Sequence, residues 1–223
     1  MPPTIQPFRE PRRVYCAGPL FNEPERHEME AIAGALRASG FEPWLPHADG
    51  LEFAKVLPYL TDERHEPAAA GRLLHEAIFA LDVYQVVLGC GSLVLNINGR
   101  VPDEGAVSEA AIAWTLGKPI VIYKADARSN VSGRDNPLVV GLTRFNVIDQ
   151  IGAIGDALAA QIAEWAVNPQ AEVSCSPHLD GTLAAGQRLW RRLAVLDGDR
   201  QVERVAAAVM DEFGSPALTK NLT

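Results

Sequence analysis

Short apolar runs alternate with amphipathic stretches between residues 13 and 167, and this alternation limits the folds open to the chain more than any single motif. Five runs have the length and apolar character of buried strands: residues 13–18, 41–46, 92–97, 119–123 and 144–148. Four longer segments place apolar residues at helical spacing: residues 23–38, 72–88, 105–116 and 151–167. Strands that alternate with helices in this way are typical of βαβ units. The sequence therefore predicts an α/β fold with a flavodoxin-like, doubly wound, five-stranded parallel sheet.

The composition of the chain changes after residue 167. We predict that residues 1–167 form the α/β domain and that residues 168–223 form a linker and a C-terminal helical extension. The reason is that residues 168–181 are rich in polar and turn-forming residues, and an Ala- and Leu-rich helical pattern follows them. Residues 47–71 are polar and interrupted by prolines, which predicts a long surface loop. Sheets of this kind bind ligands at the carboxyl ends of their strands, so we expect the site there.

Composition and charge exclude several classes of protein. With 223 residues and 48% hydrophobic content, the chain can bury a sizeable core, which excludes a disordered protein. The net charge is −8 and no cluster of Lys or Arg stands out, so we expect no nucleic-acid partner. No run is apolar enough to span a membrane, and the first residues carry no secretory signal. A cytoplasmic protein without a membrane partner is the expectation.

The cysteines and glycines give no sign of a cofactor. Cys16, Cys90 and Cys175 lie far apart and form no CxxC pair, which argues against a disulfide framework and a zinc site. The chain also has no dinucleotide-binding glycine fingerprint and no metal-ligand spacing. We therefore predict no cofactor and no metal.

Asp82 stands out because its surroundings in the sequence are apolar. It is the only charged residue between Glu76 and Arg100. An ionised carboxylate costs several kcal/mol to bury without partners, so a buried Asp82 would be a functional candidate. The alternative is an aspartate on a narrow solvent-facing stripe of the helix, shared with Gln85.

Glu109 is the only charged residue of the predicted helix 105–116, which is apolar nearly all round. We expect it near the first turn, where the helix dipole keeps a carboxylate ionised, as a nucleophile or general base. A capping interaction with the helix start is the alternative. Asp103 precedes the helix and has the propensity of an N-cap. Tyr15 lies within the first strand, where its ring either packs or brings a hydroxyl to a carboxylate.

Five segments that occur in this order are Val14-Tyr-Cys-Ala-Gly-Pro-Leu-Phe21, Asp82, Pro102-Asp-Glu-Gly-Ala-Val-Ser-Glu109, Gly117-Lys-Pro119 and Asn136-Pro-Leu138. Together they resemble the nucleoside 2-deoxyribosyltransferase family, over about residues 12–165. The resemblance implies a flavodoxin-like fold and an enzyme of nucleoside salvage that transfers a 2-deoxyribosyl group between bases. Its expected partners are nucleosides, nucleobases and further copies of the chain.

The resemblance also implies roles for single residues. Glu109 matches the nucleophile that attacks C1′ and forms a covalent deoxyribosyl-enzyme, and Tyr15 matches the tyrosine that orients it. Asp82 matches an aspartate that passes a proton to the leaving base. Asp103 matches a residue that binds the sugar, and Asn136 one that reaches the sugar from a neighbouring subunit. Three further motif positions are expected to contact substrate: Gly18, Phe21 and Gly105.

The chain departs from the family pattern at two places, and other functions stay open. Gly105-Ala106 stands where the family has Gly-Thr, and Glu109-Ala-Ala111 where it has Glu-Leu-Gly. One alternative is an N-hydrolase that acts on a 2′-deoxynucleoside or its 5′-monophosphate, with water as the acceptor. The other is a nucleoside-binding protein without turnover. In the turn at residues 18–25, Pro19 supplies no N–H and two glutamates repel an anion, which disfavours a phosphate and favours a nucleoside.

Overall fold

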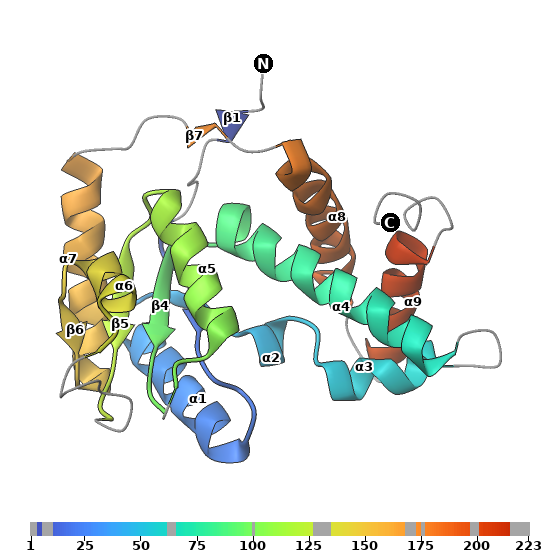
Figure 1. Ribbon diagram of the computed structural model, residues 1–223, viewed down its shortest axis with the longest axis horizontal. Coiled ribbons are helices and arrows are strands. Elements are labelled where there is room, and N and C mark those ends of the chain that lie inside the picture. The colour runs from blue at the N-terminus through green and yellow to red at the C-terminus, as the bar shows by residue number, and fades with distance from the viewer. Residues whose placement is uncertain are drawn as a thin grey trace. The chain divides into compact units, whose positions relative to one another are not determined.

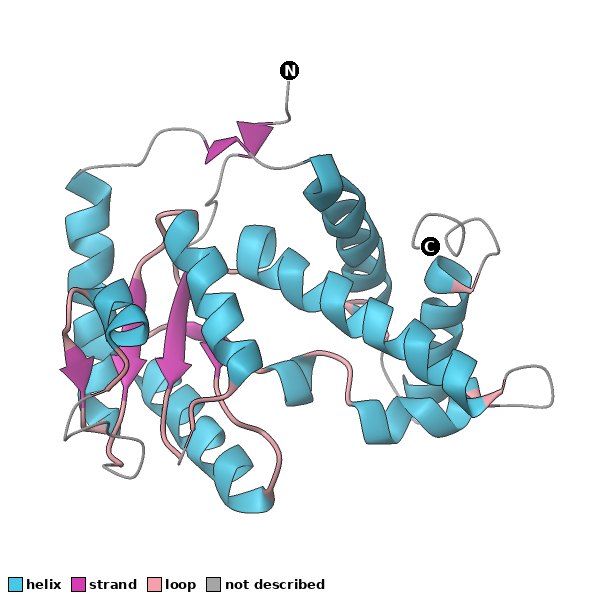
Figure 2. Cartoon of the chain, viewed as in Figure 1, coloured by secondary structure: helices cyan, strands magenta, loops and turns pink. Residues whose placement is uncertain are grey.

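The structure is a computed structural model that describes residues 4–5, 11–61, 66–99, 101–126, 135–167, 173–174, 177–196 and 201–214. These residues form two compact units. The α/β unit comprises described residues of 4–45 and 86–174, and the helical unit comprises those of 46–85 and 175–223. The helical unit shows only helices and loops among its described residues, whereas the α/β unit contains the sheets (Figure 2).

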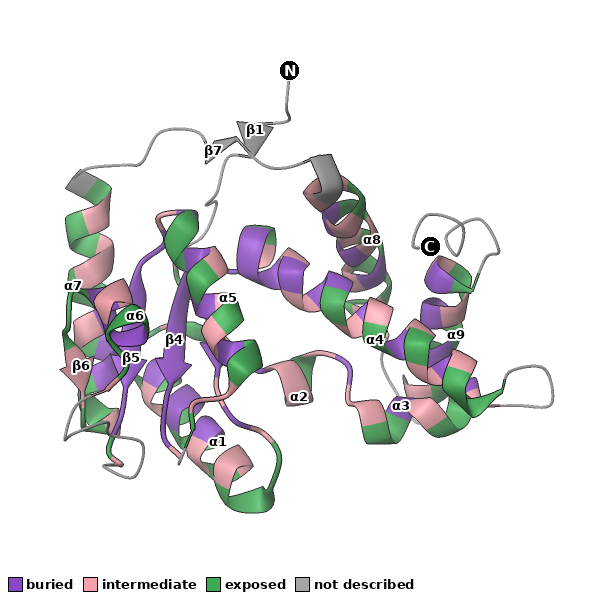
Figure 3. Ribbon diagram, in the orientation of Figure 1, coloured by how far each residue is buried: buried purple, intermediate pink, exposed green. Residues whose placement is uncertain are grey.

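The main sheet has five parallel strands, which are listed by their bounds: β2 (Arg13–Ala17), β3 (Glu42–Trp44), β4 (Ser92–Asn96), β5 (Ile120–Tyr123) and β6 (Val147–Ile148). Their spatial order is β3-β2-β4-β5-β6, which is the flavodoxin-like order and confirms the predicted fold class. Every residue of β4 is buried, because helices cover both faces of a parallel sheet (Figure 3). A separate antiparallel pair joins β1 (Thr4–Ile5) and β7 (Val173–Ser174).

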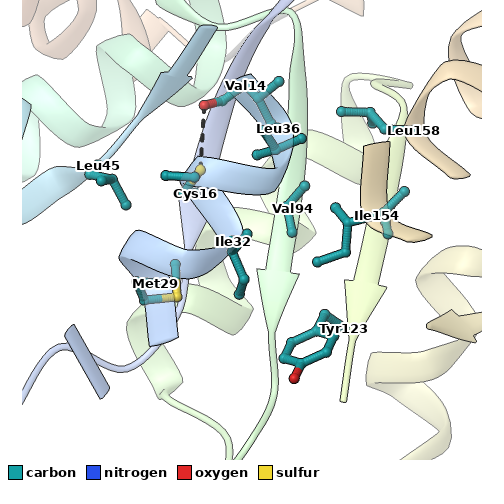
Figure 4. Close-up of a cluster of buried hydrophobic side chains, with 12 residues drawn as sticks. Val14, Cys16, Met29, Ile32, Leu36, Leu45, Val94, Tyr123, Ile154 and Leu158 are labelled. Atoms are coloured by element: carbon teal, nitrogen blue, oxygen red, sulfur yellow. Dashed lines mark hydrogen bonds between the residues drawn. The ribbon is translucent and has the colours of Figure 1, made fainter. Parts of the chain in front are cut away.

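The core on one face of the sheet lies under α1 (Glu23–Ala38) and α7 (Ile154–Val167) (Figure 1). Val14 and Cys16 of β2 point into it, together with side chains of α1, α7, β4 and β5 (Figure 4). Because successive side chains of a strand point to opposite faces, Tyr15 points to the other face. That face is covered by α5 (Glu104–Thr115), which contacts β2, β4 and β5.

The last predicted strand is much shorter than expected. Residues 137–143 form α6 (Pro137–Val140) and the 3-10 helix η2 (Gly141–Thr143). Arg144 and Phe145 then adopt φ angles of 53° and 66°, which a strand does not accommodate. The prediction of a strand over 144–148 is therefore wrong at its start, and β6 keeps only Val147–Ile148. The 3-10 helix η3 (Ile151–Ala153) leads into α7.

The helical unit replaces the long loop predicted for residues 47–71. Its first helices are α2 (Pro46–Asp49), α3 (Phe53–Leu60) and α4 (Pro67–Tyr84). Pro46 and Pro67 open helices instead of interrupting them, because the first helical position needs no N–H donor. The other two helices are α8 (Pro177–Leu193), which packs on α4, and α9 (Gln201–Phe213), which packs on α3. The loop prediction is thus wrong for the described part of 47–71.

Candidate active site

Tyr15 and Glu109 meet beside the sheet, although 94 positions separate them in the chain. Tyr15 is the middle residue of β2 and is fully buried, and its hydroxyl donates to Glu109 Oε1 at 2.6 Å. Glu109 lies on α5 and is partly exposed. A carboxylate held in one orientation by a buried phenol is suited to act as a nucleophile or a general base.

The position of Glu109 within α5 differs from the prediction. Because the helix begins at Glu104, Glu109 lies in its second turn and does not cap the helix start. The helix dipole acts mainly within the first turn, so it is not what fixes this carboxylate. The group that holds the Glu109 carboxylate in place is the Tyr15 hydroxyl.

Asp103 caps the start of α5, as its propensity predicts. Its Oδ1 accepts the Ala106 N–H at 2.6 Å. Burial raises the pKa of Asp103, and the charges of Glu104 and Glu25 raise it further, against the lowering by backbone hydrogen bonds from Ala106 and Gly105. A Cβ on Gly105 would lie 3.2 Å from Asp103 Oδ1, so a side chain at position 105 would crowd this cap.

The turn between β2 and α1 is built around Gly18 and Glu25. A Cβ on Gly18 would lie 2.5 Å from Met29 Sδ and 2.9 Å from Asn96 Cβ, so α1 and β4 approach here only because residue 18 is a glycine. Glu25 accepts the Phe21 N–H at 2.8 Å, and the Phe21 side chain is 78% exposed. Phe21 is thus open to a ligand.

Sequence reasoning missed a group of polar side chains at the carboxyl end of β4. Asn96 and Asn98 are buried and donate to Glu28 of α1 at 2.9 and 2.7 Å. Asn98 Oδ1 accepts the Ala125 N–H at 2.9 Å. These contacts join the loops that follow β4 and β5 to α1. The signal in the sequence is a pair of amide residues directly after a buried strand.

Asp82 belongs to α4 of the helical unit and is partly buried. Burial raises its pKa from 3.8 to about 7, so this carboxyl is an acid that titrates near neutral pH. Gln85 is fully buried, which excludes the stripe of solvent-facing residues that it was expected to share with Asp82.

Asn136 is exposed and caps α6, where its side chain accepts the Leu138 N–H at 3.0 Å. The residue before it, Asp135, forms an ion pair with the buried Lys124 at the end of β5. Of the predicted site residues, the structure therefore brings Tyr15 together with Glu109. It leaves Asn136 on the surface of its own chain.

Two features are absent from the described residues, a metal-binding cluster and a membrane-spanning helix. The described ranges contain no group of three or more His, Cys, Asp or Glu side chains arranged to hold a metal ion. In the same part of the chain, no helix combines the length and the apolar character that crossing a bilayer requires.

Comparisons with known proteins identify relatives of the chain. Residues 14–143, more than half of the sequence, match the model of a family described as nucleoside 2-deoxyribosyltransferase. No curated protein matches. Among solved structures, a conserved protein from Enterococcus faecalis V583 is 19% identical with a TM-score of 0.49, and the match covers 67% of this chain and 98% of that one. A 2-desoxiribosyltransferase from Leishmania mexicana is 16% identical with a TM-score of 0.36, at 72% and 100% coverage.

Proposed function

Because the chain belongs to the nucleoside 2-deoxyribosyltransferase family, we propose that it cleaves the N-glycosidic bond of a 2′-deoxynucleoside and transfers the sugar to another nucleobase. The observation that carries this proposal is the 2.6 Å hydrogen bond from Tyr15 to Glu109. A nucleophilic carboxylate must keep a fixed orientation toward the anomeric carbon, and this hydrogen bond to Oε1 fixes the orientation of Glu109.

In the proposed reaction, a Glu109 oxygen forms a bond to C1′ while the C1′–N bond breaks and its electron pair stays with the base. Asp82 gives its proton to the departing base, and the sugar remains as an ester of Glu109. A second base then attacks C1′, Glu109 leaves, and Asp82 takes back a proton from the incoming base. Two displacements at one carbon retain its configuration. A carboxyl with a pKa of about 7 can serve as acid and base in turn.

Charges around the helix starts favour a nucleoside over its 5′-monophosphate. A carboxylate already takes one backbone N–H group in the turn before α1 and one in the first turn of α5, after the carboxyl ends of β2 and β4. Glu25 accepts from Phe21 and Asp103 accepts from Ala106. Two carboxylates at these positions repel a phosphate and suit the hydroxyl groups of an uncharged sugar.

The other proposed site residues follow from their matching positions. Asp103 and Gly105 hold the sugar at the start of α5, and Gly18 and Phe21 contact substrate from the turn before α1. Asn136 reaches the sugar bound by a second copy of the chain, which requires a homo-oligomer.

The experiment mixes the protein with a deoxynucleoside and a different free base, and follows both the products and the mass of the peptide that holds Glu109. A new nucleoside together with one deoxyribosyl unit on that peptide supports the proposal. Free deoxyribose without new nucleoside favours the N-hydrolase, and binding without any product favours a protein that binds nucleosides without turnover.

Glu109→Ala tests the role of the nucleophile. We expect it to abolish both the transfer and the mass shift, because no other oxygen replaces the carboxylate. The control is Glu164→Gln. It neutralises an exposed glutamate of α7 that forms an ion pair with Arg144. Undiminished turnover of Glu109→Ala would end the proposal for this residue.

A further inference from the structure

A second aromatic ring packs against Tyr15 on the face of the sheet that carries Glu109. Trp44 is the last residue of β3 and stands directly beside Tyr15 in the register of β2 and β3. In-register residues of neighbouring parallel strands point to the same face. The two ring centroids are 5.0 Å apart and the ring planes are inclined by 33°. Tyr15 is fully buried and Trp44 is 1% exposed.

The contact with Trp44 bears on where the Tyr15 hydroxyl lies. The hydroxyl is at the far end of a long side chain, so a small change in either side-chain torsion moves it by a large fraction of a hydrogen-bond length. A 2.6 Å hydrogen bond tolerates little such movement. The backbone of β2 fixes only the Cβ atom, and the packing of the ring decides the rest.

Trp44 is also an unexpected choice for a core position. Its indole Nε1 is buried and has no hydrogen-bond partner among the described residues. A buried donor without an acceptor costs free energy that an apolar side chain in the same place would not. Stability alone therefore does not account for an indole here, whereas the broad ring surface that it offers to Tyr15 does.

We propose that Trp44 is a positioning residue for Glu109 that acts through Tyr15, by confining the Tyr15 ring so that its hydroxyl stays on the Glu109 carboxylate. This inference rests on the proposed function for its catalytic consequence. The hydrogen bond itself exists in the free protein and is tested without substrate.

The first measurement is the exchange of the Tyr15 hydroxyl proton with water, followed by NMR and assigned through its loss in Tyr15→Phe. In Trp44→Leu, which removes the ring surface, we expect exchange to become at least about tenfold faster. In Trp44→Phe, which keeps an aromatic ring and removes the N–H, we expect exchange within about threefold of the wild type. Should Trp44→Leu not fold, Trp44→Met takes its place, since a flexible side chain fills an irregular space.

The second measurement is the rate at which deoxynucleoside glycosylates Glu109, compared in a double-mutant cycle with Tyr15→Phe. Trp44→Leu should slow this step by about tenfold with little change in KM, because misplacement of a reacting group acts on the chemical step. In the Tyr15→Phe background it should have no further effect. Leu36→Ala, a cavity on the opposite face of the sheet, is the control for lost stability.

Four results would overturn the proposal. A Tyr15 proton that stays protected in Trp44→Leu shows that the ring is held without Trp44. Additive effects in the double variant, or a slowing equal to that of Leu36→Ala, show that Trp44 acts by another route. If Trp44→Phe speeds the exchange of the Tyr15 proton as much as Trp44→Leu does, the effect belongs to the indole N–H and not to the ring surface. If neither the wild type nor any variant is glycosylated, the proposed function fails. The exchange measurement then still decides whether Trp44 holds the Tyr15 ring in place.

Discussion

One hydrogen bond connects the buried sheet to the carboxylate that is proposed to react. Tyr15 places its hydroxyl 2.6 Å from Glu109 Oε1, from a side chain with no exposed surface. Because the donor lies inside the protein, water does not compete for it as it does for a hydrogen bond on the surface. The orientation of Glu109 is therefore a property of the folded sheet and is set before substrate arrives.

Tyr15→Phe tests this hydrogen bond at almost constant volume. A hydrogen bond to a charged group contributes about 1.5–3 kcal/mol, and if that is lost in the transition state the rate falls roughly 10- to 100-fold. We expect this decrease in the single-turnover rate of Glu109 glycosylation, with the thermal midpoint changed by only a few degrees. An unchanged rate would show that Glu109 is oriented by other groups.

Asp82 makes the stability of the chain depend on pH. Its pKa is about 7 in the folded protein and near 3.8 when unfolded, so between these values the folded state binds the additional proton. The free energy of unfolding therefore falls as pH rises through this window, and the loss is complete above pH 7. Asp82→Asn removes the titration and should stabilise the protein by on the order of 2 kcal/mol at pH 8, with a smaller gain at pH 5.

Urea unfolding at pH 5 and pH 8 measures the effect of Asp82→Asn, and the exposed Asp156→Asn on α7 is the control. Asp82→Asn should also lose transfer activity, because an amide cannot supply the proton that the departing base takes. A gain in stability that is equal at both pH values would contradict the raised pKa.

At the scale of elements, the sequence predicts those features that local chemistry determines. The bounds of α1 agree with the predicted 23–38, and Gly40 and Gly117 adopt φ angles of 80° and 68° just after α1 and α5. The buried strand β4 follows from its continuous apolar run. Each of these rests on residues that are neighbours in the chain.

Contacts between segments that are distant in the chain could not be predicted from local sequence patterns. The pairing of Tyr15 with Glu109 was expected only through the family resemblance, since no local pattern joins residues 94 positions apart. Nothing in the sequence indicates that Trp44 packs against Tyr15, because strand register is decided by the whole sheet. The hydrogen bond between Asn98 and Glu28 was not predicted either, because these residues come together only in the folded chain.

Lys118 joins two elements from within the motif Gly117-Lys-Pro119. It is 6% exposed, and its Nζ donates to the carbonyls of Val86, Val87 and Cys90 at 2.6, 2.9 and 2.6 Å. These carbonyls belong to the π-helix η1 (Gln85–Gly89) and to the residue just beyond it. Burial lowers the pKa of Lys118 to about 8. The lysine thus satisfies the carbonyl groups at the end of a helix where no further turn follows.

Lys118→Met should destabilise the protein by roughly 3 kcal/mol, because it keeps the apolar stem and leaves three buried carbonyls without their donor. Lys55→Met is the control, since Lys55 is 66% exposed and pairs with Glu52 on the surface. Chemical unfolding of both variants at pH 7 measures the difference. Equal stability of the two would mean that the carbonyls of η1 find other donors.

At the scale of the whole molecule, the order of the chain differs from the order of its compact units. The helical unit takes α2, α3 and α4 from between β3 and η1, and α8 and α9 from the end of the chain. The contacts of α4 with α8 and of α3 with α9 connect segments that are far apart in the chain. The predicted domain boundary after residue 167 stays a prediction. Besides packing against each other, α3 and α4 pack against the C-terminal helices α8 and α9.

Two glycines of α8 test this arrangement. A Cβ on Gly186 would run into the backbone carbonyl of Ala80 and lie 2.6 Å from Tyr84 Cβ, whereas a Cβ on Gly181 meets nothing within 4 Å. Gly186→Ala should therefore lower the free energy of unfolding by about 1–3 kcal/mol, since α4 must move away. Gly181→Ala should raise it by up to about 1 kcal/mol, because alanine favours the helix. Thermal unfolding followed by circular dichroism compares the two variants, and a stabilising Gly186→Ala would show that α4 and α8 do not pack at this glycine.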